Sequence, residues 1–286
     1  MISRRRFLQA GATGTLALLG ARQLFGGEAK VDPKEGAAVL VDLTRCIGCR
    51  ACENACRLRW GFAPLPPATI GYGPGDEKLT FRTRTFVDFR NGGTKPKQPV
   101  KRQCMHCLEP SCVSACPVAA LEKTAAGPVI YREELCIGCR YCVLACPFNV
   151  PKYEWENALM PRVGKCDFCA ERQAKGQSPA CVAACPTGTL KFGKRAELLQ
   201  EAKARMLAQP ERYTSLYGED VVGGTSWFYL SDRSPEELGF PKDLPRESLP
   251  SLTWRAISKV PFVVIGVGLL LSAVVRWRSR GNLEQP

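Results

Sequence analysis

Uncharged residues form a long run near the C-terminus, where the hydrophobic pattern of the chain is clearest. Residues 260–275 are sixteen uncharged residues, most of them Val, Leu, Ile or Phe, between Lys259 and Arg276. At a rise of about 1.5 Å per residue, a helix of this length covers roughly 24 Å, which is short of a hydrocarbon core of about 30 Å. The run therefore needs its flanking residues to cross a membrane.

Those flanking residues are of the kinds that sit at membrane interfaces. Trp254 and Trp277 lie on either side of the run, and the lysine before it can extend its ammonium group toward water. The pattern predicts a transmembrane anchor over residues 254–277, with a buried core helix as the alternative. Arginines at 276, 278 and 280 follow the run, so the positive-inside rule predicts that the tail, residues 278–286, is cytoplasmic.

The N-terminus has the pattern of an export signal. Three arginines, Arg4 to Arg6, precede Phe7-Leu8 and an uncharged Ala/Gly/Leu run from Ala10 to Ala21. This pattern predicts a twin-arginine signal over residues 1–29, with a basic disordered tail as the alternative. Gly27-Glu28-Ala29 has small residues at the two critical positions but departs from the Ala-x-Ala pattern of a cleavage site. The sequence therefore leaves both cleavage and retention of the signal open. Together with the C-terminal anchor, it predicts a protein on the periplasmic face of the bacterial inner membrane.

Between the two ends, the chain alternates short strands with loops and short helices. Residues 37–44 (Ala-Ala-Val-Leu-Val-Asp-Leu-Thr), 129–131 and 189–192 have the composition of strands. The spacing of Leu198, Leu199 and Met206 predicts a helix over residues 194–209 that packs on the core.

Two further segments complete the expected domain organisation. Residues 57–100 form an insertion, rich in Gly and Pro at first and strand-like from Phe81 to Phe89. It is expected to be a surface excursion, with a packing loop or a docking surface for a partner as the alternatives. It interrupts a cysteine-rich domain over residues 37–195. Residues 196–250 are expected to be a C-terminal extension that leads to the anchor.

Charge changes this picture little. A formal net charge of +13 raises the question of nucleic acid binding, because clustered Lys and Arg bind phosphates. However, residues 1–29 have a net charge of +3 and residues 251–286 one of +4, so seven of the thirteen charges lie at the two ends. The distribution therefore favours membrane targeting over nucleic acid binding.

Sixteen cysteines are the dominant chemical feature, and they fall into four groups of four. The groups are Cys46, Cys49, Cys52 and Cys56; Cys104, Cys107, Cys112 and Cys116; Cys136, Cys139, Cys142 and Cys146; and Cys166, Cys169, Cys181 and Cys185. The first and third have the C-x2-C-x2-C-x3-C spacing of bacterial ferredoxins. Proline follows the last cysteine of every group except the first, where Arg57 takes its place.

This spacing suits iron–sulfur clusters. Three cysteines on a tight loop can bind three irons of one cubane, and the fourth, expected at the start of the next helix, points to the second cluster of a pair. Disulfides and zinc are the alternatives. Dense groups repeated four times with Cys-Pro endings make poor disulfide frameworks, and each group supplies more thiolates than one zinc ion needs. The split fourth group fits zinc best.

Other kinds of chemistry find little support in the sequence. The chain has one histidine, His106, between Cys104 and Cys107, and a hydrogen bond near a cluster is its expected role because that group already has four cysteines. We find no Ser-His-Asp set, phosphate-binding loop or carboxylate pair in a recognisable frame. No catalytic residue is therefore expected.

Two segments of the sequence carry a family resemblance. They are Cys104-Met-His-Cys107 through Cys116-Pro117, and Cys136-Ile-Gly-Cys139 through Cys146-Pro147-Phe-Asn-Val-Pro-Lys-Tyr153. From about residue 37 to 275 the chain resembles the four-cluster subunits of membrane-bound respiratory oxidoreductases. It is most similar to the ferredoxin-like subunit of periplasmic nickel–iron hydrogenases, and nearly as similar to the β subunit of membrane-bound formate dehydrogenase. The chain's own export signal favours the hydrogenase subunit.

The resemblance implies an α+β fold of two ferredoxin-like modules holding four [4Fe–4S] clusters. It implies that the first group pairs with the fourth, and the second with the third. The implied ligand sets are Cys46, Cys49, Cys52 and Cys185; Cys166, Cys169, Cys181 and Cys56; Cys104, Cys107, Cys112 and Cys146; and Cys136, Cys139, Cys142 and Cys116.

The resemblance also implies a function and partners. The chain is expected to relay electrons between the catalytic and small subunits of a hydrogenase and a quinone-reactive membrane subunit. The alternative partner is the catalytic subunit of a formate dehydrogenase or a related molybdopterin oxidoreductase.

Overall fold

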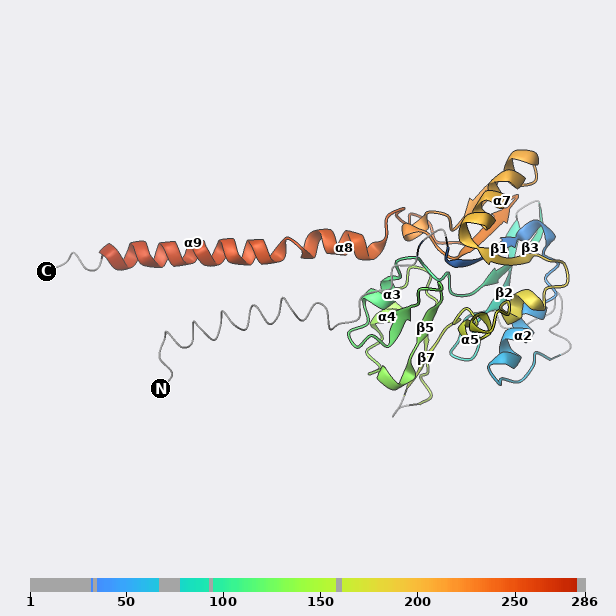
Figure 1. Ribbon diagram of the computed structural model, residues 1–286, viewed down its shortest axis with the longest axis horizontal. Coiled ribbons are helices and arrows are strands. Elements are labelled where there is room, and N and C mark those ends of the chain that lie inside the picture. Colours follow the sequence, from blue (N-terminus) through green and yellow to red (C-terminus); the bar gives the residue numbers. More distant parts are fainter. Residues whose placement is uncertain (1–31, 33–34, 67–77, 93–94, 158–160, 282–286) are drawn as a thin grey trace.

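One long helix projects from a folded body that contains all sixteen cysteines (Figure 1). The computed structural model describes residues 32, 35–66, 78–92, 95–157 and 161–281. The predicted export signal and residues 282–286 of the predicted tail lie outside the described residues.

A four-stranded sheet joins distant parts of the chain. Its strands, in spatial order, are β8 (Leu190–Lys194), β1 (Ala37–Asp42), β10 (Trp227–Ser231) and β9 (Ser215–Tyr217). β1 pairs antiparallel with β8 and parallel with β10, and β10 pairs antiparallel with β9. The segment predicted as a C-terminal extension thus supplies two of the four strands, so it is part of the core.

Alternate residues of this sheet face two different cores, as the period of two in a strand requires. Val39 and Val41 pack in the cluster that contains the cysteine loops. Ala38 and Leu40 pack in a second cluster, against helix α7 (Arg195–Ala208). Both faces of β1 are covered, which explains its nearly continuous apolar sequence.

Three two-stranded hairpins and several short helices surround this sheet. The hairpins are β2 (Phe86–Gly92) with β3 (Lys95–Arg102), β4 (Leu121–Lys123) with β5 (Val129–Tyr131), and β6 (Lys152–Tyr153) with β7 (Val163–Gly164). The short helices are α2 (Ala51–Arg59), α3 (Ser111–Ser114), α4 (Tyr141–Ala145), α5 (Ala170–Ala174) and α6 (Ala180–Ala183), with 3-10 turns η2 (Leu43–Arg45), η4 (Glu133–Leu135) and η5 (Val221–Gly223).

Packing between the short helices follows the order of the cysteine groups. α2, from the first group, packs on α6, from the fourth, and α3 packs on α4. The β4–β5 hairpin connects α3 to α4, whereas β1 precedes α2 and β8 follows α6. The segments of the second and third groups therefore lie, in sequence, between the two halves of the unit that contains the first and fourth groups.

The structure differs from two sequence expectations. The later half of the insertion is not a surface excursion, because Val87 and Val100 are 3% and 0% exposed. The fourth cysteine of each group does not begin a helix: Cys116, Cys146 and Cys185 come at or just after the end of α3, α4 and α6. A proline comes directly after each of these three cysteines. Proline is common just after the end of a helix because it cannot continue the helix.

The missing proline of the first group has a visible consequence. Helix α2 continues through Cys56 and ends at Arg59, whereas the corresponding helices of the other groups stop before their last cysteine. Without a proline, the backbone N–H groups needed for another helical turn remain available. The last cysteine of the first group therefore lies within a helix.

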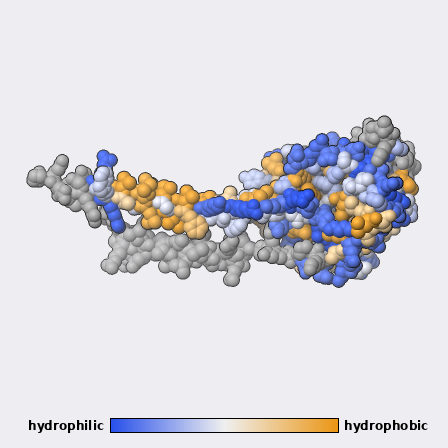
Figure 2. Space-filling view, turned by 90° about the horizontal axis from the view of Figure 1, so that it is seen from above, coloured by the Kyte–Doolittle hydropathy of each residue, from blue (hydrophilic) through white to orange (hydrophobic). Residues whose placement is uncertain are grey.

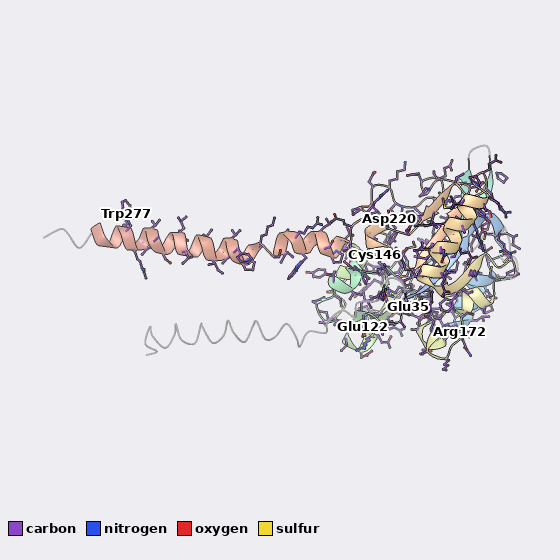
Figure 3. All side chains as sticks on the ribbon, turned by 45° about the horizontal axis from the view of Figure 1, so that its top comes forward. Glu35, Glu122, Cys146, Arg172, Asp220 and Trp277 are labelled. Carbon is purple, nitrogen blue, oxygen red and sulfur yellow. The ribbon has the colours of Figure 1, made fainter. Side chains whose placement is uncertain are left out.

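The C-terminal segment consists of α8 (Leu249–Ile257) and α9 (Val260–Gly281), which extend away from the body. Figure 2 shows the outer part of this segment as mainly hydrophobic and the part next to the body as more hydrophilic, and Figure 3 places Trp277 near its outer end. Residues Leu249–Arg278 are long and apolar enough to cross a membrane, and none of the most apolar stretch is buried against the rest of the chain. Among the described residues, it is therefore not packed as a core helix.

Candidate iron–sulfur cluster sites

The first and third cysteine groups fold into the same local structure. In each, a glycine two residues after the first cysteine has a positive φ, 69° at Gly48 and 71° at Gly138. The arginine after the second cysteine is also left-handed, with φ of 57° at Arg50 and 64° at Arg140, and a helix begins at the next residue. These left-handed residues reverse the chain twice in a few residues, so successive cysteines turn toward one side.

The second and fourth groups turn without glycine. His106 has a φ of 47°, and Phe168 and Cys169 have φ of 60° and 53°. Non-glycine residues in this region are uncommon and are held there by their surroundings. Both His106 and Phe168 are buried, and their rings stack with centroids 4.8 Å apart.

One cavity brings together cysteines from opposite ends of the folded body's sequence. Cys46, Cys49 and Cys52 line it together with Cys185 of the fourth group, and Lys101 also contributes to its wall. These four cysteines are the first ligand set implied by the family resemblance.

Cys56 lies with the remaining cysteines of the fourth group. Burial raises the pKa of its thiol to about 12, and the thiols of Cys181 and Cys169 add to that rise. The pKa of Cys166 is raised by burial and then by Cys56. The mutual influence of these four thiols places them in one neighbourhood, which is the second implied set.

The third implied set gathers in the same way. The pKa of Cys107 is raised well above its usual value by burial, and further by the thiols of Cys104, Cys146 and Cys112. Cys146 belongs to the third cysteine group, and Figure 3 shows it within the body.

The fourth implied set lies closest to the surface. Burial raises the pKa of Cys142 to about 11, and the thiols of Cys136, Cys116 and Cys139 raise it further. Cys139 is exposed to solvent. In each of these neighbourhoods, thiols from two different cysteine groups act on one another.

Comparisons with known proteins indicate what the cysteines bind. Residues 98–195 match the family model "4Fe-4S dicluster domain", and residues 43–61 match "4Fe-4S binding domain". All sixteen cysteines fall within these two matches.

Full-length relatives extend the match to most of the chain. A protein of Nitratidesulfovibrio vulgaris is 42% identical over 92% of this chain and 73% of its own length. The hydrogenase-2 operon protein HybA of Escherichia coli O157:H7 is 35% identical over 84% of each chain. The nitrate-inducible formate dehydrogenase iron-sulfur subunit of Escherichia coli K12 is 35% identical over 80% of each chain.

The chain belongs to this family of ferredoxin-like iron–sulfur subunits. The resemblance found in the sequence is thereby confirmed, as is the absence of a catalytic role, because members of the family are electron-transfer components of larger oxidoreductases.

Backbone N–H groups in the iron–sulfur subunit point at cysteine sulfurs, as they do around protein-bound clusters. The Ala120 N–H donates to Cys116 Sγ at 3.2 Å, and the Phe168 N–H donates to Cys166 Sγ at 3.3 Å. At Cys185, burial raises the thiol pKa, but N–H groups that include that of Leu190 lower it more. These donors favour a negatively charged sulfur.

The chemistry of the donor sets fits iron–sulfur clusters. All sixteen cysteines are free of disulfide bonds. In the described part of the chain, no three His, Cys, Asp or Glu side chains converge closely enough to hold a single metal ion. A cubane is bound by four thiols, and each implied set has four cysteines.

His106 has a structural role next to these sets. It is fully buried, and its Nδ1 accepts a hydrogen bond of 2.9 Å from the Val129 N–H. Burial lowers the His106 pKa well below its usual value, and neighbouring lysines lower it further. The ring is therefore neutral, with its proton on Nε2, which has no hydrogen-bond partner in the described residues.

Sequence reasoning missed the buried lysines that surround this histidine. Lys101, Lys123 and Lys165 are 3%, 2% and 2% exposed. Their burial has no local sequence signal, since it depends on how β3, β4 and the segment after β7 come together.

Proposed function

We propose that this iron–sulfur subunit conducts electrons through four [4Fe–4S] clusters, from a periplasmic catalytic subunit to a quinone-reactive membrane subunit. The observation that supports the proposal is the cavity that Cys46, Cys49 and Cys52 of the first group share with Cys185 of the fourth, together with the influence of thiols from different groups on one another elsewhere. A bound [4Fe–4S] cluster accepts and releases one electron at a time.

The proposed ligands are the four sets described above. Cys46, Cys49, Cys52 and Cys185 bind one cluster, and Cys166, Cys169, Cys181 and Cys56 bind its neighbour in the first module. Cys104, Cys107, Cys112 and Cys146 bind one cluster of the second module, and Cys136, Cys139, Cys142 and Cys116 bind the other. The packing of α2 on α6 and of α3 on α4 supports this exchange of fourth ligands between groups.

The two modules differ in their distance from the C-terminal helix. α3 of the second module contacts α8, and the Ser248 hydroxyl at the start of α8 donates a hydrogen bond to the Glu109 carboxylate just before α3. Figure 1 shows α2 of the first module on the opposite side of the body. We propose that the second module faces the membrane partner and the first module faces the catalytic subunit.

The proposed location is the periplasmic face of the inner membrane. The exposed apolar helix α9 supports a membrane anchor, because leaving it in water would expose a continuous apolar surface. Arginines at 276, 278 and 280 favour a cytoplasmic C-terminus. Export of the folded body through the proposed twin-arginine signal fits clusters inserted before translocation.

The hydrogenase assignment is proposed over formate dehydrogenase on the export signal of the chain itself. Relatives carry both names, since one is a hydrogenase-2 operon protein and another a formate dehydrogenase iron-sulfur subunit. The alternative partner is therefore the catalytic subunit of a formate dehydrogenase.

An activity assay on the membrane complex tests the proposal. The complex is extracted in mild detergent through a tag on this chain, and reduction of a quinone analogue is followed with hydrogen or with formate. Hydrogen-dependent reduction is expected. Formate-dependent reduction would move the subunit to the alternative complex, and no reduction with either donor would contradict both assignments.

A further inference from the structure

Three fully buried lysines lie in the interior between the cysteine sets. Lys101 is on β3, Lys123 ends β4 and Lys165 follows β7, and each is at most 3% exposed. Lysines are almost never fully buried unless they are paired, because removing an ammonium group from water is costly. The positions of all three therefore require a compensating interaction.

Their hydrogen bonds supply acceptors but no opposite charge. Lys101 Nζ donates to Thr85 Oγ1 at 2.8 Å and to Gln103 Oε1 at 2.9 Å. The other two ammonium groups donate to backbone carbonyls, Lys123 to His106 and Gly127, and Lys165 to Val129 and Cys166. Within the described ranges, no carboxylate forms an ion pair with any of the three.

Cysteines provide the negative partners of Lys101. Burial alone would lower the Lys101 pKa, but interaction with Cys181, Cys52 and Cys166 raises it above its usual value. Cys52 belongs to one proposed ligand set of the first module, and Cys166 and Cys181 belong to the other. Lys101 lines the cavity of Cys46, Cys49, Cys52 and Cys185. Its ammonium group lies 4.6 Å from the centre of the Trp227 ring, which packs in the same core cluster as Cys52 and Cys181.

The other two lysines are close to one set of the second module. Burial lowers the Lys123 pKa to about 8, and the thiols of Cys107 and Cys104 oppose that change. Lys165 is among the charged groups that act on Cys112, in the same set. The groups that act most strongly on Cys142, in the outermost set, are other cysteines.

We propose that Lys101 is a shared internal counter-ion of the two clusters in the first module and raises the reduction potential of both. Lys123 and Lys165 act in the same way on the cluster at Cys104, Cys107, Cys112 and Cys146. This inference rests on the proposed assignment of clusters to the cysteine sets.

The sign of the effect follows from charge. One-electron reduction adds a negative charge to a cluster, so a nearby ammonium group stabilises the reduced form more than the oxidised form. In the low-dielectric interior this interaction is screened far less than at the surface.

An EPR-monitored redox titration of full-length protein, purified anaerobically in detergent, tests the proposal. Lys101→Met removes the charge and keeps most of the volume, whereas Lys101→Arg keeps the charge. Lys203→Met is the control, since Lys203 is 56% exposed and pairs with Glu219 on the surface. Each variant is compared with the wild type, so clusters in copurifying subunits do not affect the comparison.

In Lys101→Met, two midpoint potentials should fall, and the reduced-to-oxidised ratio of those clusters at a fixed potential should drop by about tenfold, or about 59 mV for one electron. In Lys101→Arg, the two midpoint potentials should stay close to those of the wild type. In the control, Lys203→Met, neither potential should change. If Lys101→Met lost the two clusters while Lys101→Arg bound both in full, the result would also support a counter-ion role for Lys101.

Two outcomes overturn the inference. Unchanged potentials in a fully loaded Lys101→Met protein would mean that the charge has no effect on the clusters, and equal loss of clusters in the Met and Arg variants would assign Lys101 a steric role. Iron analysis of the wild type distinguishes these outcomes from failure of the proposed function. A wild-type protein that lacked four clusters would contradict the proposed function, whatever the effect of the Lys101 variants.

Discussion

At the scale of single residues, the repeated sequence Cys-Ile-Gly-Cys-Arg produces a repeated backbone conformation. Gly48 and Gly138 have φ of 69° and 71°, and each is followed two residues later by a left-handed arginine. An L-residue with a side chain is disfavoured at such angles, so glycine is required for geometry and not for chemistry. The two loops differ in what surrounds the glycine.

Gly48→Ala should destabilise the protein more than Gly61→Ala. Both glycines have a φ of 69°, but a Cβ at position 48 would lie 2.7 Å from the Phe89 ring, whereas position 61 faces open space. Backbone strain of roughly 1 kcal/mol is common to both, and only Gly48→Ala adds a steric clash. Thermal unfolding under anaerobic conditions should show a larger fall in Tm for Gly48→Ala; equal falls would contradict the loop geometry.

Cys185→Ala tests the exchange of fourth ligands. Cys185 shares a cavity with Cys46, Cys49 and Cys52, so its loss should disturb the cluster at that set. EPR spectra of the variant should lose or alter one signal, and the same signal should change in Cys46→Ala. If the altered signal instead matched the one lost in Cys169→Ala, the fourth group would bind its own cluster and the exchange would be wrong.

At the scale of elements, local patterns predicted some segments well and others not at all. The strands expected at 37–44, 129–131 and 189–192 appear as β1, β5 and β8, and the helix expected at 194–209 appears as α7. Strand β10 was not predicted, although its sequence Trp-Phe-Tyr-Leu-Ser is entirely buried. A continuous apolar run has no period of two, and its parallel partner β1 is far away in the sequence.

Tertiary packing decided the remaining elements. The insertion over residues 57–100 was expected on the surface, yet Val87 and Val100 of its β2–β3 hairpin are buried. Trp227 is a core residue, whereas Trp155 is 71% exposed and packs edge-on against Tyr153. Such placements depend on contacts between distant segments, which no local pattern records.

Two leucines of helix α7, one buried and one exposed, test whether this helix packs on the core. Leu198 is 2% exposed and contacts the β1–β10 face, whereas Leu207, on the same helix, is 85% exposed. Leu198→Ala should lower the free energy of unfolding by about 2–5 kcal/mol, and Leu207→Ala by less than about 0.5 kcal/mol. Thermal unfolding that showed similar losses for the two variants would contradict the assignment of α7 to the core.

At the scale of the whole molecule, two features could be foreseen from the sequence and one could not. The cysteine spacing predicted iron–sulfur chemistry, and the uncharged run predicted the long apolar helix that leaves the body. The buried lysines between the cysteine sets could not be foreseen, because lysine in sequence is usually a sign of an exposed position.

The arrangement of the whole molecule also suggests why charge is placed inside it. The cysteine sets occupy much of the space that a hydrophobic core would fill, and bound clusters would make that space negative. Three buried ammonium groups offset this charge in the interior, next to three of the four sets. The outermost set contains the exposed Cys139, where solvent can screen the charge.

Quantitative iron and acid-labile sulfide analysis of the anaerobically purified full-length protein tests the central claim most directly. Four [4Fe–4S] clusters require about 16 irons and about 16 sulfides per chain, with little zinc. About 8 irons would mean that only one module binds clusters, and zinc without sulfide would contradict the electron-transfer account.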